Sequence, residues 1–233
     1  MNLKHLMIFV LEMKKIQNIL SLMILSLTVL TLHGCDDDDP AEPTPPETST
    51  MMDVDGNVYI TVKIGDQWWM AENLKVTSYR NGDPVTEAQT SSNWINSTNG
   101  AWCYYSNNVE APGLLYNYSA VSDPRNIAPD GWRIPTDEDW KKLERHLGMS
   151  ESESNKTGWR GSNEGEKLKI EENKGWVVYE DVWSTNESGF TALAGSCRLF
   201  DGVWGDPGLQ HTGFWWTSTE HPDGKVWYRH LDY

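Results

Sequence analysis

Pro129–Trp140 reads PDGWRIPTDEDW and contains the clearest helix start in the chain. Thr136 is the predicted N-cap, because its hydroxyl can accept a hydrogen bond from a backbone N–H of the first turn. Asp137, Glu138 and Asp139 follow, and their negative charges favour the positive end of the helix dipole. Asp139 stands where a capping box usually has Glu or Gln, so we expect a weaker version of that motif.

The residues after this start predict one amphipathic helix. Trp140, Leu143 and Leu147 are spaced i, i+3 and i+7, which places them in one apolar stripe. Gly148 follows the stripe and can end the helix in the left-handed conformation. A second, shorter helix is expected around Leu114–Val121.

The remaining body reads as short strands joined by turns. Residues 58–64 and 67–71 are apolar and β-branched segments on either side of a Gly-Asp pair, which predicts a hairpin with a type II′ turn. Residues 213–219 and 225–231 predict a second hairpin. With few helix signals, the expected fold class is α+β, a strand-rich single domain with few short helices.

The composition supports one packed body and excludes one class of partner. The chain has 233 residues, with 34 acidic and 19 basic side chains and a net charge of −15. A field of this sign repels polyanions, so no nucleic-acid partner is expected. All 13 tryptophans lie at or after Trp68, and such large side chains are costly to leave in water. A packed body from about this residue onward is therefore predicted.

Residues 1–34 read as a signal peptide, with Met13 as the expected true start. Residues 19–32 form an apolar run behind Lys14 and Lys15, which is the order found in a secretory signal. The run is shorter than the roughly 20 residues that a membrane-spanning helix needs. We therefore expect the protein to be exported.

The sequence LHGC at Leu32–Cys35 resembles a bacterial lipobox, in which the cysteine is acylated and becomes the new N-terminus. Cys35 is therefore the predicted lipid anchor to the membrane; the alternative is a free buried cysteine behind an ordinary cleaved signal. Four aspartates and a proline-rich stretch follow, and their charge and low apolar content oppose collapse. Residues 35–52 are expected to be the lipidated cysteine and a disordered stalk, and residues 53–233 the folded domain.

A series of motifs in the body resembles the Fibrobacter succinogenes major paralogous domain. The motifs are WMAENLK (69–75) with YRNGDP (79–84), GAWCYYSN (100–107), GLLYNYSAV (113–121), PDGWRIPT (129–136), GFTALAG (189–195) and FWWTSTE (214–220). The resemblance covers nearly all of the body. It implies an extracytoplasmic domain without an established activity, so it transfers no functional residues.

The helix start at 129–140 is also similar, more distantly, to that of formylglycine-generating sulfatase-modifying factors. This similarity implies a C-type-lectin-like architecture, which is a fold-level analogy and transfers no activity. Members of the resembled family usually continue past the segment that matches Trp227–Tyr233, so we expect the family's last C-terminal strand to be missing. Its loss would leave an unpaired edge.

The acidic run behind Cys35 bears on localisation. Such runs resemble the surface-export signals of Bacteroidetes lipoproteins, so we expect display on the outer leaflet of the outer membrane, at the cell surface. In enterobacteria an aspartate at this position resembles a signal for retention in the inner membrane, and this alternative stays open.

Two further cysteines, Cys103 and Cys197, remain in the body. Two cysteines in an exported protein predict one disulfide. The family resemblance leaves a second interpretation open, in which Cys103 is the partner of a C-terminal cysteine that this chain lacks. A nucleophilic cysteine is a third interpretation, but no segment matches the catalytic segment of the sulfatase-modifying factors.

No metal, cofactor or catalytic site is expected. The histidines lack zinc-site spacing, and the Asp201–Asp206 loop lacks the ligand register of an EF-hand. Trp94, Trp183 and Trp204 lie among Asn, Ser, Gly and Asp, so we expect these rings to face solvent. A solvent-facing indole is a surface on which a sugar ring can stack.

These features predict a lipid-anchored, surface-exposed binding or adhesion module without catalysis. A polysaccharide or other surface glycan is its expected partner. One alternative is an enzyme of the sulfatase-modifying-factor type. The other is a purely structural surface protein or a degenerate paralogue.

Overall fold

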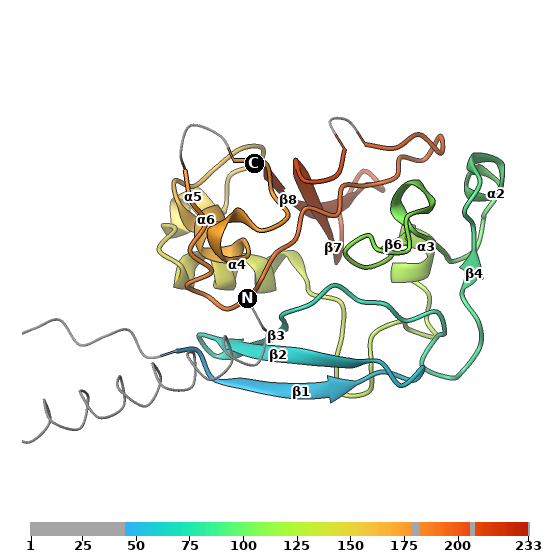
Figure 1. Cartoon of the computed structure of the whole chain (residues 1–233), viewed down its shortest axis with the longest axis horizontal. Helices are drawn as coiled ribbons and strands as arrows, with labels where there is room; N and C mark the ends of the chain where they lie inside the picture. The colour runs from blue at the N-terminus through green and yellow to red at the C-terminus, as the bar shows by residue number, and fades with distance from the viewer. Residues whose placement is uncertain (1–44, 179–181, 206–207, 233) are drawn as a thin grey trace, which may run out of the picture. The chain divides into compact units, whose positions relative to one another are not determined.

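The structure, a computed structural model, describes residues 45–178, 182–205 and 208–232 (Figure 1). Its elements are, in chain order, β1 (Thr48–Met52), β2 (Val58–Ile64), β3 (Gln67–Met70), β4 (Thr86–Glu87), α2 (Ser91–Ile95), β5 (Ala101–Cys103), the 3₁₀ helix η1 (Tyr105–Asn107), β6 (Leu115–Tyr116), α3 (Tyr118–Val121), α4 (Asp137–His146), α5 (Glu151–Ser154), α6 (Glu164–Leu168), the 3₁₀ helix η2 (Glu171–Asn173), β7 (Thr212–Glu220) and β8 (Val226–Asp232). These elements confirm the α+β, strand-rich fold class with short helices.

The first sheet has the strand order β1-β2-β3. β2 and β3 pair antiparallel from Thr61 opposite Met70 to Ile64 opposite Gln67, which confirms the first predicted hairpin. Gly65 has a φ of 63°, whereas Asp66 does not have a positive φ. A positive φ at the first turn position alone fits the type II′ turn and excludes type I′.

β1 corrects the domain boundary that we expected after residue 52. It pairs antiparallel with β2, from Thr48 opposite Val62 to Met52 opposite Val58. Most of its side chains are exposed, so the strand is held by its backbone bonds to β2 and gives no apolar signal in the sequence. The compact folded unit therefore starts before β1, at Pro45.

Helix α4 forms as its sequence predicts. The side chain of Thr136 accepts a hydrogen bond from the backbone N–H of Asp139, and the carboxylate of Asp139 accepts one from the N–H of Thr136. Both halves of the capping box are therefore present, with Asp in place of Glu. Trp140, Leu143 and Leu147 are buried, which confirms the predicted apolar stripe.

The stripe of α4 packs into the larger of the described cores. Its other members come from the first sheet and from the segment that precedes β7; they include Val62, Ile64, Trp69, Leu168, Trp176, Phe190 and Ala192. In Figure 1 this core lies between the β1–β3 sheet and the helices α4 and α6. The fold therefore joins residues that are more than a hundred positions apart in the sequence.

A second core surrounds the small sheet with the order β4-β5-β6. β4 runs parallel to β5, and β6 runs antiparallel to it. The helix expected at 114–121 forms only at Tyr118–Val121, because β6 occupies the residues before it. The side chain of Asn117 starts the helix by accepting a hydrogen bond from the N–H of Ala120.

β7 and β8 form the second predicted hairpin. Trp215 lies opposite Arg229, and these two side chains face α4, since Arg229 contacts the α4 residues Glu144 at 2.7 Å and Asp137 at 2.8 Å. Side chains alternate along a strand, so the neighbouring pair of Phe214 and His230 lies on the opposite face of the hairpin. We call this second face the outer face of β7–β8.

Candidate functional site

The described structure contains an aromatic groove of about 1210 Å³. Its walls come from β3, the loop before α4, the segment 190–200 and the β7–β8 hairpin. The rings along it that are exposed or half-buried are those of Trp68, Tyr116, Trp132, Phe200, Phe214, Trp215, Trp216 and Tyr228. Segments that are far apart in the sequence thus bring their aromatic rings to one surface.

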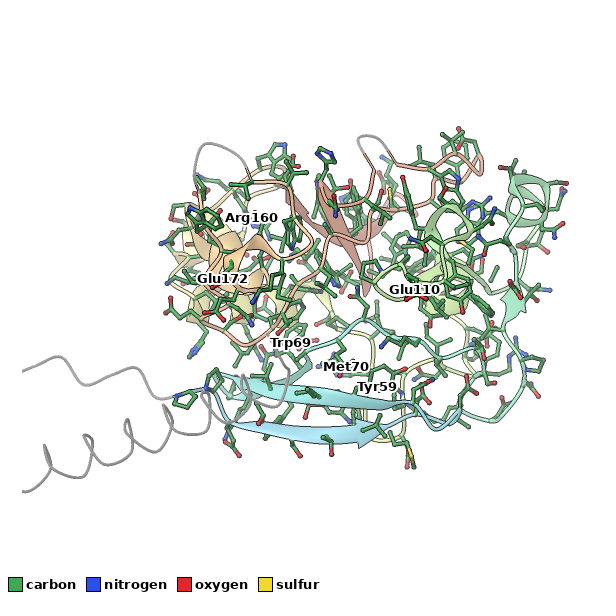
Figure 2. All side chains as sticks on the ribbon, in the orientation of Figure 1. Tyr59, Trp69, Met70, Glu110, Arg160 and Glu172 are labelled. Carbon is green, nitrogen blue, oxygen red and sulfur yellow. The ribbon has the colours of Figure 1, made fainter. Side chains whose placement is uncertain are left out.

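The floor of the groove is a packed set of buried aromatic rings. The ring centroids of Trp69 and Trp140 are 4.8 Å apart, and Phe190 lies 5.9 Å from Trp69 and 5.6 Å from Trp140. Figure 2 shows Trp69 on β3, beside Met70. The indole N–H groups of Trp69 and Trp140 are buried without an acceptor in the described part of the chain. An unpaired buried donor costs about 1–3 kcal/mol, so both favour an acceptor brought by a ligand or water.

Two acidic residues, Glu72 and Asp139, line the groove, and the carboxylate of Asp139 is fixed as an anion. Asp139 is paired with the guanidinium of Arg133 and also accepts a hydrogen bond from Gln67 at 3.2 Å. The pairing with Arg133, with further hydrogen bonds from Thr136, holds the pKa of Asp139 well below its usual range. A carboxylate that stays ionised at neutral pH does not serve as a proton donor, so Asp139 supplies charge and caps α4.

The structure corrects one of the three predicted solvent-facing tryptophans. Trp94 is only 6% exposed, and its indole N–H donates to the carbonyl of Leu199 at 2.9 Å. Its polar sequence neighbours gave no sign of this partner, which lies far along the chain. Trp94 is therefore a core residue, although it lies in the lining of the aromatic groove, and it is not the solvent-facing ring that we expected.

The other two tryptophans are more accessible. Trp204 is half-buried between the guanidinium of Arg198, 4.2 Å from its ring, and the ring of Tyr105 at 5.0 Å. Trp183 is 56% exposed, as predicted, but it does not line the aromatic groove. The structure thus does not bring the three predicted rings together into one site.

Cys103 and Cys197 are free cysteines in the structure, so the predicted disulfide is not formed. Cys103 is buried beside the guanidinium of Arg198. The sulfur of Cys197 instead lies against Gly205, in the space that a side chain there would fill.

Neither thiol has the environment of a nucleophile. Burial raises the pKa of Cys103 and also that of Cys197. A reactive cysteine needs the opposite shift, toward the thiolate. Cys35, the predicted lipid anchor, lies outside the described residues.

The described residues lack two features, a cluster of metal-ligating side chains and a membrane-spanning helix. They contain no group of three or more His, Cys, Asp or Glu side chains that could hold a metal ion. They also contain no helix with the length and apolarity needed to cross a bilayer.

Sequence reasoning missed the main ring surfaces of the site. Phe200 is 91% exposed at the groove, and Trp159 is 70% exposed. Trp159 lies in the sequence Gly-Trp-Arg-Gly (158–161), and its small and polar neighbours resemble those of Trp94 and Trp183. The same local pattern therefore predicts an exposed ring at Trp159. The rings of Phe214 and Trp216 gave no such signal, because both lie in a strand pattern that predicts burial.

The amino-acid sequence was compared with known proteins, solved structures and family models. No curated protein and no solved structure matches the chain. The model of the Fibrobacter succinogenes major domain matches residues 62–232. This range starts within β2 and includes α4, the aromatic groove and both strands of the last hairpin. The match covers well over half of the sequence, and the chain therefore belongs to the Fibrobacter succinogenes major domain family.

Proposed function

We propose that the protein is a lipid-anchored binding module, displayed at the cell surface, that holds a neutral polysaccharide in its aromatic groove. The observation that carries the proposal is the groove itself, with aromatic rings from separate segments gathered along about 1210 Å³. Large, mostly apolar hollows with a few polar groups are the usual form of ligand sites. A sugar ring suits such a site, because its C–H face packs on an aromatic ring and its hydroxyls take up polar partners.

The charge of the chain favours a neutral glycan over an acidic one. The net charge of −15 opposes the approach of a polyanion. Within the groove, Arg133 is already paired with Asp139, so this guanidinium is not available as an isolated cation. A polysaccharide without carboxylate or sulfate groups therefore fits the surface better than one with them.

The site supports binding better than catalysis. The sulfatase-modifying-factor alternative requires a reactive thiol, whereas burial raises the pKa of both described cysteines. The groove carboxylate of Asp139 is ionised and committed to its hydrogen bonds. Because neither the cysteines nor Asp139 is suited to catalysis, the aromatic rings along the groove are the feature proposed to contact a ligand.

Attachment to the membrane completes the proposal. The lipobox-like sequence ending at Cys35 supplies the acyl anchor, and the acidic stalk behind it favours export to the outer leaflet. A groove carried on such a tether would hold a glycan close to the cell. The molecule would then act as an adhesion or capture module.

The groove can be tested with a ring that contributes little to the core. Trp68 lines the groove and is 39% exposed, so Trp68→Ala should leave the fold intact. We expect the full-length protein in detergent to bind a neutral polysaccharide, such as a β-glucan, xylan or mannan, and Trp68→Ala to bind it about tenfold more weakly by titration calorimetry. Trp68→Phe should restore most of the affinity.

Trp183→Ala is the matched control, because it removes an exposed indole that does not line the groove. It should bind like the unaltered protein. Absence of binding to every neutral polysaccharide, or an equal loss in both alanine variants, would contradict the proposed function.

A further inference from the structure

The outer face of β7–β8 carries a continuous series of rings. Phe214 and His230 are cross-strand partners, and their rings are stacked with centroids 4.2 Å apart and planes at 7°. The ring of Tyr228 lies 5.7 Å from Phe214 on one side of this pair. On the other side, the indole of Trp159 lies 4.8 Å from His230. We call these four side chains, Trp159, His230, Phe214 and Tyr228, the aromatic strip.

The aromatic strip connects the groove with a second hollow. Phe214 and Tyr228 line the aromatic groove. Tyr228 also lines a neighbouring hollow of about 720 Å³, together with His230 and Trp159. The two hollows thus share Tyr228 as part of one wall, and the strip runs from the first into the second.

Trp159 is held in place although it is exposed. One side of its indole is covered by His230, while 70% of the residue is accessible to solvent, so it adds little to a core. The next residue is Arg160, which is labelled in Figure 2. It is fixed by two hydrogen bonds of 2.8 Å to the carboxylate of Glu144. Glu144 also binds Arg229 of β8 at 2.7 Å. The loop is therefore tied to the strand that carries His230.

The polar groups of the second hollow offer both donors and acceptors. Lys169 is buried there, with its ammonium 4.0 Å from the carboxylate of Glu166. Nε of Arg160 and Nε2 of His230 are buried and have no hydrogen-bond partner in the described part of the chain. Glu164 supplies another carboxylate to the same hollow. A polyol can use donors and acceptors together, because each hydroxyl both donates and accepts.

We infer that the aromatic strip extends the glycan site beyond the groove, with Trp159 as the outermost surface for a sugar ring. The inference rests on the proposed function and narrows it, because the ligand is then a long, neutral, linear polysaccharide rather than a small oligosaccharide. A ring that is exposed, held rigidly and continuous with the groove binds at low cost in conformational entropy. Its contribution appears only when the ligand is long enough to reach it.

The test therefore varies the length of the oligosaccharide. A size series of oligosaccharides, cut from the neutral polysaccharide that the unaltered full-length protein binds best, is titrated against the protein in detergent. We expect affinity to rise with chain length. We expect Trp159→Ala to lower it about tenfold for the longest members and to leave the shortest unchanged. Trp159→Phe should keep most of the gain, and Trp183→Ala should behave like the unaltered protein.

The outcomes separate this inference from the function on which it rests. Trp68→Ala should weaken binding at every chain length, because the groove holds short and long ligands alike. If Trp159→Ala binds oligosaccharides of every length like the unaltered protein, or loses affinity for short and long ones equally, the extension of the site along the aromatic strip is wrong. Neither result would contradict the binding of a glycan in the groove. If the unaltered protein binds no member of any series, both are wrong. Thermal unfolding of each variant checks that the exposed ring was removed without loss of the fold.

Discussion

At the scale of single residues, Glu144 is the carboxylate on which the last hairpin depends. Its oxygens accept hydrogen bonds from Arg160 at 2.8 Å and from Arg229 at 2.7 Å, and all three side chains are largely buried. Removing one partner of a buried pair leaves an uncompensated charge and costs about 3–5 kcal/mol. Glu144→Gln should therefore lower the free energy of unfolding by about 3 kcal/mol, measured by urea denaturation.

Glu138→Gln is the matched control on the same helix. Glu138 pairs with Arg145 at 2.6 Å, but its side chain is mostly exposed. Exposed pairs contribute about 0–1 kcal/mol, because water screens them. A loss as large in Glu138→Gln as in Glu144→Gln would show that burial of the network is not what stabilises the hairpin.

Asp139 predicts how this region responds to acid. Its pKa in the folded protein is depressed, first by Arg133 and then by Thr136, below the ordinary value of 3.8. The unfolded chain therefore takes up a proton first as the pH falls. The stabilisation is complete above pH 3.8 and is lost progressively below it. Asp139→Asn should lower the melting temperature at neutral pH.

The difference between the two proteins should shrink progressively as the pH falls below 3.8, because the unfolded chain takes up the proton before the folded protein does. Melting temperatures across an acid series measure this. A gap between the two proteins that stays constant from neutral pH to acid would contradict the assignment.

At the scale of elements, β1 makes the clearest prediction, because a chain cut at the boundary expected from the sequence would lack it. Without Thr48–Met52, β2 becomes an open edge with unpaired backbone groups, which invites pairing with another molecule. A protein that starts at residue 53 should melt at a lower temperature and self-associate in light scattering, whereas one that starts at Pro45 should stay monomeric. Equal melting temperature and equal mass for the two forms would show that β1 adds nothing.

The elements that sequence predicted are those with local causes. The N-cap of Thr136 and the turn at Gly65 act on residues a few positions away, so α4 and the first hairpin could be predicted directly from the sequence. β1 could not, because its partner supplies its hydrogen bonds and its own side chains are exposed. The 3₁₀ helices are single turns, and the sequence contained no distinct signal for them.

The site was harder to predict than the fold, because its residues meet only through tertiary contacts. Trp94 is buried by an acceptor at Leu199, which no local pattern reveals. Conversely, Trp68 lies in a predicted strand, yet it is 39% exposed and lines the groove. Whether an indole packs in a core or offers a face to a ligand depends on the opposite wall, and that wall comes from another part of the chain.

At the scale of the whole molecule, acidity and apolar rings have separate roles. The excess of acidic side chains keeps polyanions away at long range. In the proposed function, the rings act only at contact with a neutral sugar. The ionic strength of the medium should therefore change the binding of a neutral polysaccharide little, because the proposed contacts are apolar and hydrogen-bonded.

The lipid anchor is the prediction that belongs to the whole chain, because it decides where the groove meets its ligand. Acyl chains on Cys35 would contribute about 0.8 kcal/mol of membrane-binding free energy per buried methylene, and two or more chains suffice for stable attachment. Cys35→Ser should therefore lose a metabolic palmitate-analogue label and move from the detergent phase to the aqueous phase of a Triton X-114 partition. Cys197→Ser should keep both, since that thiol lies in the folded body. Protease added to intact cells should remove the unaltered protein if it faces outward, and protection from it would favour the inner membrane. A Cys35→Ser protein that keeps its label would show that acylation occurs elsewhere.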